Sequence, residues 1–128
     1  MDILVTLPQR FGLQNWIMEG SDLPGNPWSG EEWHWYSGGA MPNIEPGERV
    51  YVCYKGKLIG YAPLVRIEKY KKSFAYVRHN GAVAVTINKH IPGFRGFRYR
   101  FWDYSEEIPF PDWTKLDLAA GQKILSRG

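Results

Sequence analysis

The stretch from Pro46 to Glu68 constrains the fold more than any other part of this chain. Two runs rich in β-branched and aromatic residues, 50–54 and 58–65, flank the dipeptide Lys55-Gly56. This connection predicts a tight β-hairpin, because its glycine supplies the positive φ that such a turn requires. Both faces of each run are apolar, so we expect the hairpin to be covered on both sides, in the wall of a small barrel or in the middle of a packed sheet.

Length and composition indicate one β-rich domain. The chain has 128 residues, which is a usual size for a single domain, and 44% of them are hydrophobic, so it can form its own core. Fourteen Gly and nine Pro indicate many short elements joined by tight turns. We predict a mainly β fold of the β-rich α+β class, with residues 1–128 as one domain and 105–128 as its C-terminal extension.

Local patterns predict seven strands and one or two short helices. Apolar residues spaced i, i+3, i+4 predict a helix at 11–19, and 116–125 is either a second short helix or a frayed end. His79-Asn80-Gly81 has the composition of a hairpin turn between two of the strands. The predicted strands are 3–7, 33–36, 50–54, 58–65, 74–78, 81–87 and 96–102.

Charge is unevenly distributed along the chain. The formal net charge is +3, but residues 66–100 contain nine Lys or Arg against one acid, Glu68, which is a net charge of +8. The rest of the chain then has seven basic and twelve acidic residues, a net charge of −5. Such segregation predicts a positive face that can meet a polyanion such as nucleic acid.

The cysteine and histidine content argues against several classes of protein. Cys53 is the only cysteine, so no intramolecular disulfide can form, and we expect a reducing, cytoplasmic location and a buried, unreactive thiol. The histidines His34, His79 and His90 lack the spacing of a metal site, so we expect no metal and no cofactor. No apolar run approaches the ~20 residues that span a bilayer, so we expect no membrane partner. The sequence does not indicate an oligomeric state.

Two aromatic segments are candidates for ligand binding. In a strand, Trp33 and Trp35 point to one face, where two indole rings either form a platform for a base or fill the core of a small barrel. In the strand predicted at 96–102, alternation places aromatic and basic side chains on opposite faces. The arginines of that strand suit phosphate contacts, or else they pair with the acids of residues 103–107.

The order of these elements resembles that of the PUA-like superfamily, which includes ASCH and EVE domains. The resemblance rests on the Pro46-Gly47-Glu48-Arg49 entry to the hairpin and on the preceding strand, helix and Trp-rich strand, and it covers roughly residues 3–102. It implies a small curved β-barrel of about five to seven strands with a cleft that binds RNA or modified bases. The Gly-x-Lys-x-x-Glu motif of ASCH amidohydrolases has no lysine in the corresponding stretch from Gly20, which favours a binding module over an enzyme.

We therefore predict a domain that binds RNA or another nucleic acid with single-stranded or modified bases, through an aromatic cleft edged by basic residues. No catalytic residue is assigned. The predicted stacking residues are Trp33, Trp35 and Tyr61, and the predicted phosphate contacts are Arg66, Arg78, Arg95, Arg98 and Arg100.

Two alternatives belong to other functional classes. One is a small ASCH-type amidohydrolase that acts on a modified nucleoside, with Glu32 or Glu48 activating water and Lys55 or Lys57 polarising a carbonyl group. The other is a protein-interaction module that uses the segment 109–111 as a docking strand.

Overall fold

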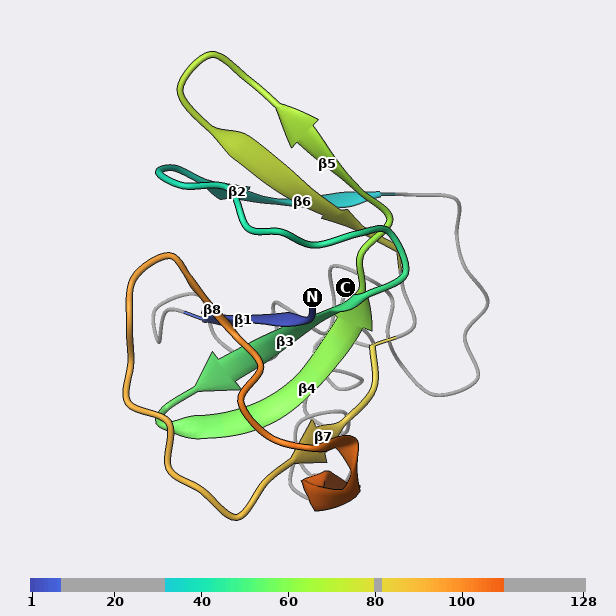
Figure 1. The fold of residues 1–128 in the computed structure, drawn as a ribbon, viewed down its shortest axis with the longest axis vertical. Coiled ribbons are helices and arrows are strands. Elements are labelled where there is room, and N and C mark those ends of the chain that lie inside the picture. The colour runs from blue at the N-terminus through green and yellow to red at the C-terminus, as the bar shows by residue number, and fades with distance from the viewer. Residues whose placement is uncertain (8–31, 80–81, 110–128) are drawn as a thin grey trace, which may run out of the picture.

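The computed structural model describes residues 1–7, 32–79 and 82–109, which form a β-rich domain (Figure 1). The only helical element in this described part is the short 3-10 helix η1 (Tyr104–Glu106). The helices predicted at 11–19 and 116–125 lie outside the described residues. The strands are β1 (Ile3–Thr6), β2 (Trp33–Ser37), β3 (Arg49–Tyr54), β4 (Lys57–Pro63), β5 (Arg66–Lys69), β6 (Phe74–Arg78), β7 (Val85–Thr86), β8 (Phe97–Tyr99) and β9 (Ile108–Pro109).

The predicted hairpin is confirmed as β3 and β4. Lys55 and Gly56 both have positive φ, at 51° and 77°, as the type I′ turn of a two-residue hairpin requires. Alternate residues enter two different cores, because Val52 belongs to one buried cluster while Tyr51 and Cys53 belong to the other. The hairpin is therefore covered on both faces, as its apolar pattern predicts.

The first sheet has the strand order β4-β3-β1-β8. Strand β1 lies inside this sheet, parallel to β3 and antiparallel to β8. Its residues Ile3 and Leu4 are fully buried on opposite faces of the sheet. One face packs against the second sheet, and the other is covered by a segment that contains Ile91 and Trp102. The first sheet is thus the centre of the molecule.

The second sheet has the order β2-β6-β5 and lies over the first sheet (Figure 1). The chain passes from the first sheet into the second at Leu64 and Val65: Leu64 N–H donates to Glu48 O, and Val65 N–H donates to Val77 O. The strand predicted at 58–65 therefore ends at Pro63, and β5 begins after the crossover, at Arg66 in the other sheet. The central strand β6 is buried from Phe74 to Val77, and it contributes to the core between the sheets.

The hairpin predicted between 74–78 and 81–87 does not form. Strand β6 pairs with β2 on one side and with β5 on the other, so neither of its edges is available to the segment that follows. That segment is shorter than predicted, and its strand β7 pairs with β9, while Val83 forms an isolated bridge to Tyr61. Residues 80 and 81 of the predicted turn lie outside the described residues.

The described strands form three separate sheets, none of which closes into a barrel. The β-rich class is confirmed, whereas the closed curved barrel implied by the resemblance is not observed in the part of the chain that the structure describes. Residues 105–109 of the expected C-terminal extension contact the fold, because β9 pairs with β7 and Glu107 bonds to Tyr51. None of the described helical segments has the length and apolar character needed to cross a membrane.

Candidate binding site

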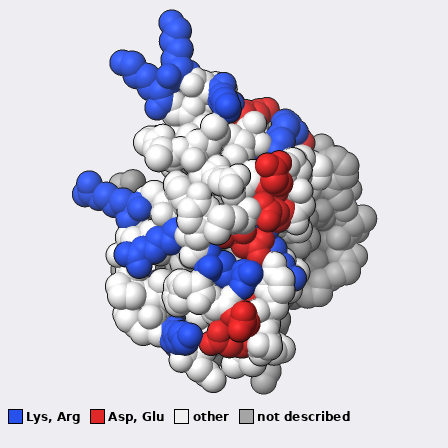
Figure 2. Space-filling model, viewed as in Figure 1, with Lys and Arg blue, Asp and Glu red and all other residues white. Residues whose placement is uncertain are grey.

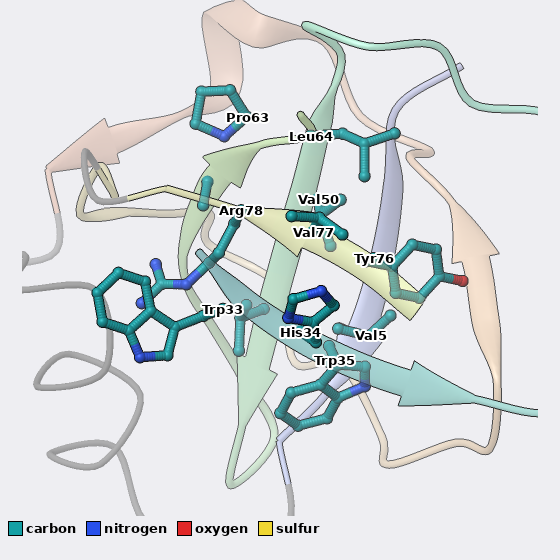
Figure 3. A pocket seen from close by; sticks show the side chains of 12 residues that line it. Val5, Trp33, His34, Trp35, Val50, Pro63, Leu64, Tyr76, Val77 and Arg78 are labelled. Carbon is teal, nitrogen blue, oxygen red and sulfur yellow. The ribbon is translucent and has the colours of Figure 1, made fainter. Parts of the chain in front are cut away.

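An open pocket lies between the two sheets, and the space free of atoms in it is about 460 Å³, part of which is open solvent (Figure 3). Its walls come from β1, β3 and β4 of the first sheet and from β2 and β6 of the second. Val5, Val50, Val52, Ala62 and Leu64 make one side of it apolar. A pocket with apolar walls and few polar groups is typical of small-molecule and cofactor sites.

Trp33 and Trp35 both line this pocket, from the edge of the second sheet. They point to the same face of β2, as strand alternation predicts, and both side chains are partly buried. Trp35 also packs against the core between the sheets. The structure therefore agrees in part with both predictions for these indoles. Trp35 contacts the core, and both rings also border an open pocket.

Strand register brings β6 residues opposite the two indoles. Arg78 pairs with Trp33, and Tyr76 pairs with Trp35, so all four side chains lie on the face of the sheet that borders the pocket. Figure 3 shows the Arg78 guanidinium beside the Trp33 indole. Tyr76 was not among the predicted site residues. The alternation of side chains along β6 directs Tyr76 toward the first sheet. Only the pairing of β2 with β6 places it beside Trp35.

The Tyr76 hydroxyl is buried and has no hydrogen-bond partner among the described residues. Burial raises the pKa of this tyrosine well above its usual value, with a smaller contribution from Tyr99. In Figure 3 the hydroxyl points away from the indoles, so the ring, and not the oxygen, borders the pocket. Tyr76 therefore contributes an apolar wall to the pocket.

Arg66 does not reach the pocket, because it is held between two carboxylates on the opposite face of the second sheet. Its guanidinium donates to Glu32 at 2.6 and 2.7 Å and to Glu68 at 3.0 Å. Each carboxylate also bonds to a histidine: His79 to Glu32 and His34 to Glu68, both at 2.9 Å. We call these five residues the outer cluster.

The outer cluster favours charged carboxylates. Hydrogen bonds from Arg66, and then from His79, lower the pKa of Glu32 from 4.5 to about 2. A general base works best when its pKa lies near the working pH, so Glu32 is a poor candidate for activating water. The predicted phosphate contact at Arg66 is replaced by these intramolecular salt bridges, which neutralise the arginine.

Tyr61 and Arg100 belong to a stack of alternating rings and guanidinium groups that also contains Arg49 and Tyr104. The Arg49 guanidinium lies 4.2 Å from the Tyr61 ring centroid and 4.3 Å from that of Tyr104. The Arg100 guanidinium also lies 4.3 Å from the Tyr104 ring centroid, so this ring contacts both arginines. Asp2 accepts a hydrogen bond from Arg100 Nε at 3.2 Å. The stack packs the segment after β8 against the first sheet and does not line the pocket.

Arg95 and Arg98 are exposed and also lie outside the pocket lining. Arg98 lies over the Phe94 ring, 4.8 Å from its centroid. The alternation predicted for this strand does not give a buried aromatic face, because Tyr99 and Phe101 are exposed while Trp102 is buried. The regular strand ends at Tyr99, so alternation no longer governs the residues that follow it.

Charge is segregated on the face that Figure 2 shows. Lys and Arg side chains project at the top, over the turn between β5 and β6, and along the left side, over β8 and the segment before it. Asp and Glu side chains form a band through the middle of this face, and some basic side chains lie beside them. Of the five arginines predicted to contact phosphates, only Arg78 lines the pocket.

The other chemical groups considered for catalysis are poorly placed. Cys53 is 2% exposed, and burial raises its thiol pKa to about 12. Glu48 accepts a hydrogen bond from the Glu45 N–H at 2.8 Å in the turn before β3. Lys55 and Lys57 lie at the β3–β4 turn, far from the start of β2 in Figure 1. Within the described residues no group of three or more metal-ligating side chains converges.

No protein-family model, no curated protein and no solved structure matches this chain. Of the eight predicted site residues, the structure brings Trp33, Trp35 and Arg78 to one pocket.

Proposed function

We propose that the pocket between the sheets binds an unpaired nucleobase, standard or modified, presented as a nucleoside or within single-stranded RNA. One observation carries the proposal: Trp33 and Trp35 border an open pocket together with the guanidinium group of Arg78. Two indoles and one forked cationic donor suit a planar, polar ring better than they suit an aliphatic ligand.

The physical chemistry of the pocket supports this ligand class. Stacking of a base on an aromatic side chain contributes ~1–3 kcal/mol, which corresponds to roughly 5- to 150-fold in affinity. The guanidinium of Arg78 offers planar donors to a base carbonyl or to a phosphate oxygen. The apolar walls around Val5 and Val50 exclude water from these interactions and so strengthen them.

The resemblance to PUA-like domains points to the same ligand class. We keep this assignment as a proposal, in which the confirmed β3–β4 hairpin and the adjoining sheets correspond to an opened form of the family's barrel. The cytoplasmic location expected from the single cysteine is part of the same proposal.

The amidohydrolase alternative has less support. The low pKa of Glu32 makes this carboxylate a weak base. Glu48 and the lysines Lys55 and Lys57 do not line the pocket. A binding module is the function that the geometry supports best.

Titration of the protein with nucleosides tests the proposal directly. Tryptophan fluorescence and calorimetry should report binding of at least one member of a panel that contains the four standard nucleosides and their acetylated and methylated forms. Trp33→Ala should weaken this binding about 5- to 150-fold, and Trp33→Phe should restore much of it. Phe101→Ala, which removes an exposed aromatic ring outside the pocket, is the matched control.

Two results would contradict the proposal: no detectable binding of any nucleoside at millimolar concentration, or equal affinities for the protein and Trp33→Ala. Equal thermal midpoints of the variants would show that a loss of binding does not reflect unfolding. Mass spectra of the recovered nucleosides separate binding from hydrolysis, because a binding module leaves their masses unchanged.

A further inference from the structure

Two exposed tyrosines lie next to each other on the face of the second sheet that points away from the pocket. Tyr36, in β2, is 65% exposed, more than any other large hydrophobic side chain among the described residues, and Tyr70, which follows β5, is 48% exposed. Their ring centroids are 6.0 Å apart, and the ring planes are tilted by 38°. A contiguous exposed aromatic pair, unlike a single exposed ring, marks a surface available to a partner.

The two rings are held in place by the outer cluster. The His34 ring stacks on Tyr36, with centroids 5.9 Å apart and an interplanar angle of 16°. Glu68 Oε1 accepts hydrogen bonds from the Tyr70 hydroxyl at 3.1 Å and from His34 at 2.9 Å. The Glu68 carboxylate therefore orients Tyr70 directly and Tyr36 through the His34 ring. A ligand would not have to order these side chains on binding.

Three exposed lysines adjoin the tyrosines at the turn between β5 and β6. Tyr70 N–H donates to Ser73 O at 2.9 Å, so Lys71 and Lys72 occupy the two central positions of this turn, and Lys69 ends β5. No ion pair joins these lysines to any residue that the structure describes. Figure 2 shows basic side chains projecting into solvent at this end of the molecule, where the hairpin of Figure 1 extends beyond the first sheet.

The one acid at the base of this hairpin, Glu68, shares the guanidinium group of Arg66 with Glu32. Glu68 lies 3.0 Å from the Arg66 guanidinium, and this contact, with the hydrogen bond from Tyr70, lowers the pKa of Glu68. Among the described residues, Arg66, Glu32 and Glu68 together leave one negative charge, against the three positive charges of Lys69, Lys71 and Lys72, so this end of the hairpin is net positive. A positive group beside two open aromatic faces is complementary to phosphates that alternate with bases.

We infer that Tyr36, Tyr70, Lys69, Lys71 and Lys72 form a platform that binds single-stranded RNA, with bases stacked on the tyrosines and phosphates at the lysines. The inference rests on the proposed function for its ligand class, but it concerns a separate surface. Strand β2 directs Trp33 and Trp35 to the pocket and Tyr36 to the opposite face. A duplex is a poor ligand for this platform, because its bases are already stacked on one another.

Binding of a fluorescently labelled 12-nucleotide single-stranded RNA, followed by anisotropy, tests the platform. Tyr36→Ala should weaken binding of this oligomer by about 5-fold or more, whereas Tyr36→Phe, which keeps the ring, should bind within about 2-fold of the unmodified protein. The same RNA in duplex form should bind more weakly than the single strand. A DNA oligomer of the same sequence establishes whether the 2′-hydroxyl contributes.

The lysines are tested through the salt dependence of binding. Each phosphate contact to a single strand adds about −0.7 to the slope of log affinity against log salt concentration. The double variant Lys71→Ala/Lys72→Ala should therefore reduce the magnitude of this slope by about 1.4. Lys57→Ala, at an exposed lysine of the other hairpin, is the control and should leave the slope unchanged.

Separate measurements with nucleosides and with RNA oligomers distinguish an incorrect platform proposal from an incorrect pocket proposal. Loss of oligomer affinity in Tyr36→Ala, with nucleoside binding unchanged, supports the platform. Oligomer affinity and salt slope that are unchanged in both platform variants overturn it, even if nucleosides still bind the pocket. If Trp33→Ala changes nothing while Tyr36→Ala weakens the oligomer, the pocket proposal fails and the platform stands. Absence of oligomer binding to the unmodified protein overturns the platform.

Discussion

The hydroxyl group of Tyr51 in β3 donates a 2.5 Å hydrogen bond to Oε2 of Glu107, a residue 56 positions later in the chain. The same oxygen accepts a hydrogen bond from Trp102 Nε1 at 2.9 Å, and Arg49 Nη1 lies 3.1 Å from Oε1. Glu107 is therefore a nearly buried carboxylate with three donors. It fastens the segment that follows β8 to the central sheet.

Replacement of this carboxylate should destabilise the fold. Glu107→Gln places an amide N–H₂ among three donors, so at least one donor loses its acceptor, and the free energy of unfolding should fall by about 1–3 kcal/mol. Urea unfolding followed by tryptophan fluorescence measures the change. Glu45→Gln, at an exposed side chain, should change stability by less than about 0.5 kcal/mol. A Glu107→Gln protein as stable as the control would show that these hydrogen bonds contribute nothing net.

The two buried tyrosine hydroxyls should respond oppositely to removal. Tyr76 has no hydrogen-bond partner among the described residues, so Tyr76→Phe should leave stability unchanged or raise it by up to about 1 kcal/mol. Tyr51→Phe removes a bond to a carboxylate and should cost about 1.5–3 kcal/mol. Both values come from the same unfolding measurement. Equal losses in the two variants would contradict the distinction.

The acid limb of the stability profile should depend on Glu32. Its pKa is lowered to about 2 in the folded protein from 4.5, so its stabilising effect is fully present above about pH 4.5 and is lost as the pH falls towards 2. Glu32→Gln should therefore lose less stability than the unmodified protein between pH 5 and pH 3. Urea midpoints across this range provide the comparison. Parallel curves would show that Glu32 titrates normally in the folded state.

The turn glycine of the central hairpin should tolerate no side chain. Gly56 has φ of 77°, and a Cβ built on it lies 2.2 Å from Cε1 of His90, so the histidine ring would have to move. Gly56→Ala should cost about 1–2 kcal/mol. Gly38→Ala has open space around its Cβ and should be nearly neutral. Thermal melts of the two variants test this difference, and a Gly56→Ala midpoint equal to that of Gly38→Ala would refute it.

The single thiol should be unreactive until the protein unfolds. Burial raises the pKa of Cys53 to about 12, and the side chain is almost completely enclosed. Labelling with a disulfide reagent at pH 8 should be slow in buffer and rapid in guanidinium chloride. Labelling at similar rates in both solutions would mean that β3 opens readily.

Local sequence patterns were sufficient for several elements of this fold. The Lys55-Gly56 turn, the two-sided burial of its strands and the common face of Trp33 and Trp35 all follow from residues close together in the chain. The pairing of β6 was not predictable in this way. The segment after Arg78 looks like a hairpin partner, but β2 and β5 already occupy both edges of β6.

The candidate site shows the same division. Sequence identified the aromatic pair and a set of arginines but could not indicate which cations meet acids. Arg66 lies 34 positions from Glu32, and Arg100 lies 98 positions from Asp2, yet each pair is joined by hydrogen bonds. The platform tyrosines are likewise far apart in the chain, because Tyr36 is in β2 and Tyr70 directly follows β5, and only the pairing of β2 and β5 with β6 brings them together.

Sequence alone therefore determined the β-rich class, the central hairpin and the direction of alternate side chains, because these depend on backbone geometry and on periodicity over a few residues. Tertiary structure decided which strands are neighbours, which arginines are neutralised and which aromatic rings border an open pocket. Those outcomes depend on free energies of contact between residues far apart in the chain, and these are realised only when the sheets have packed.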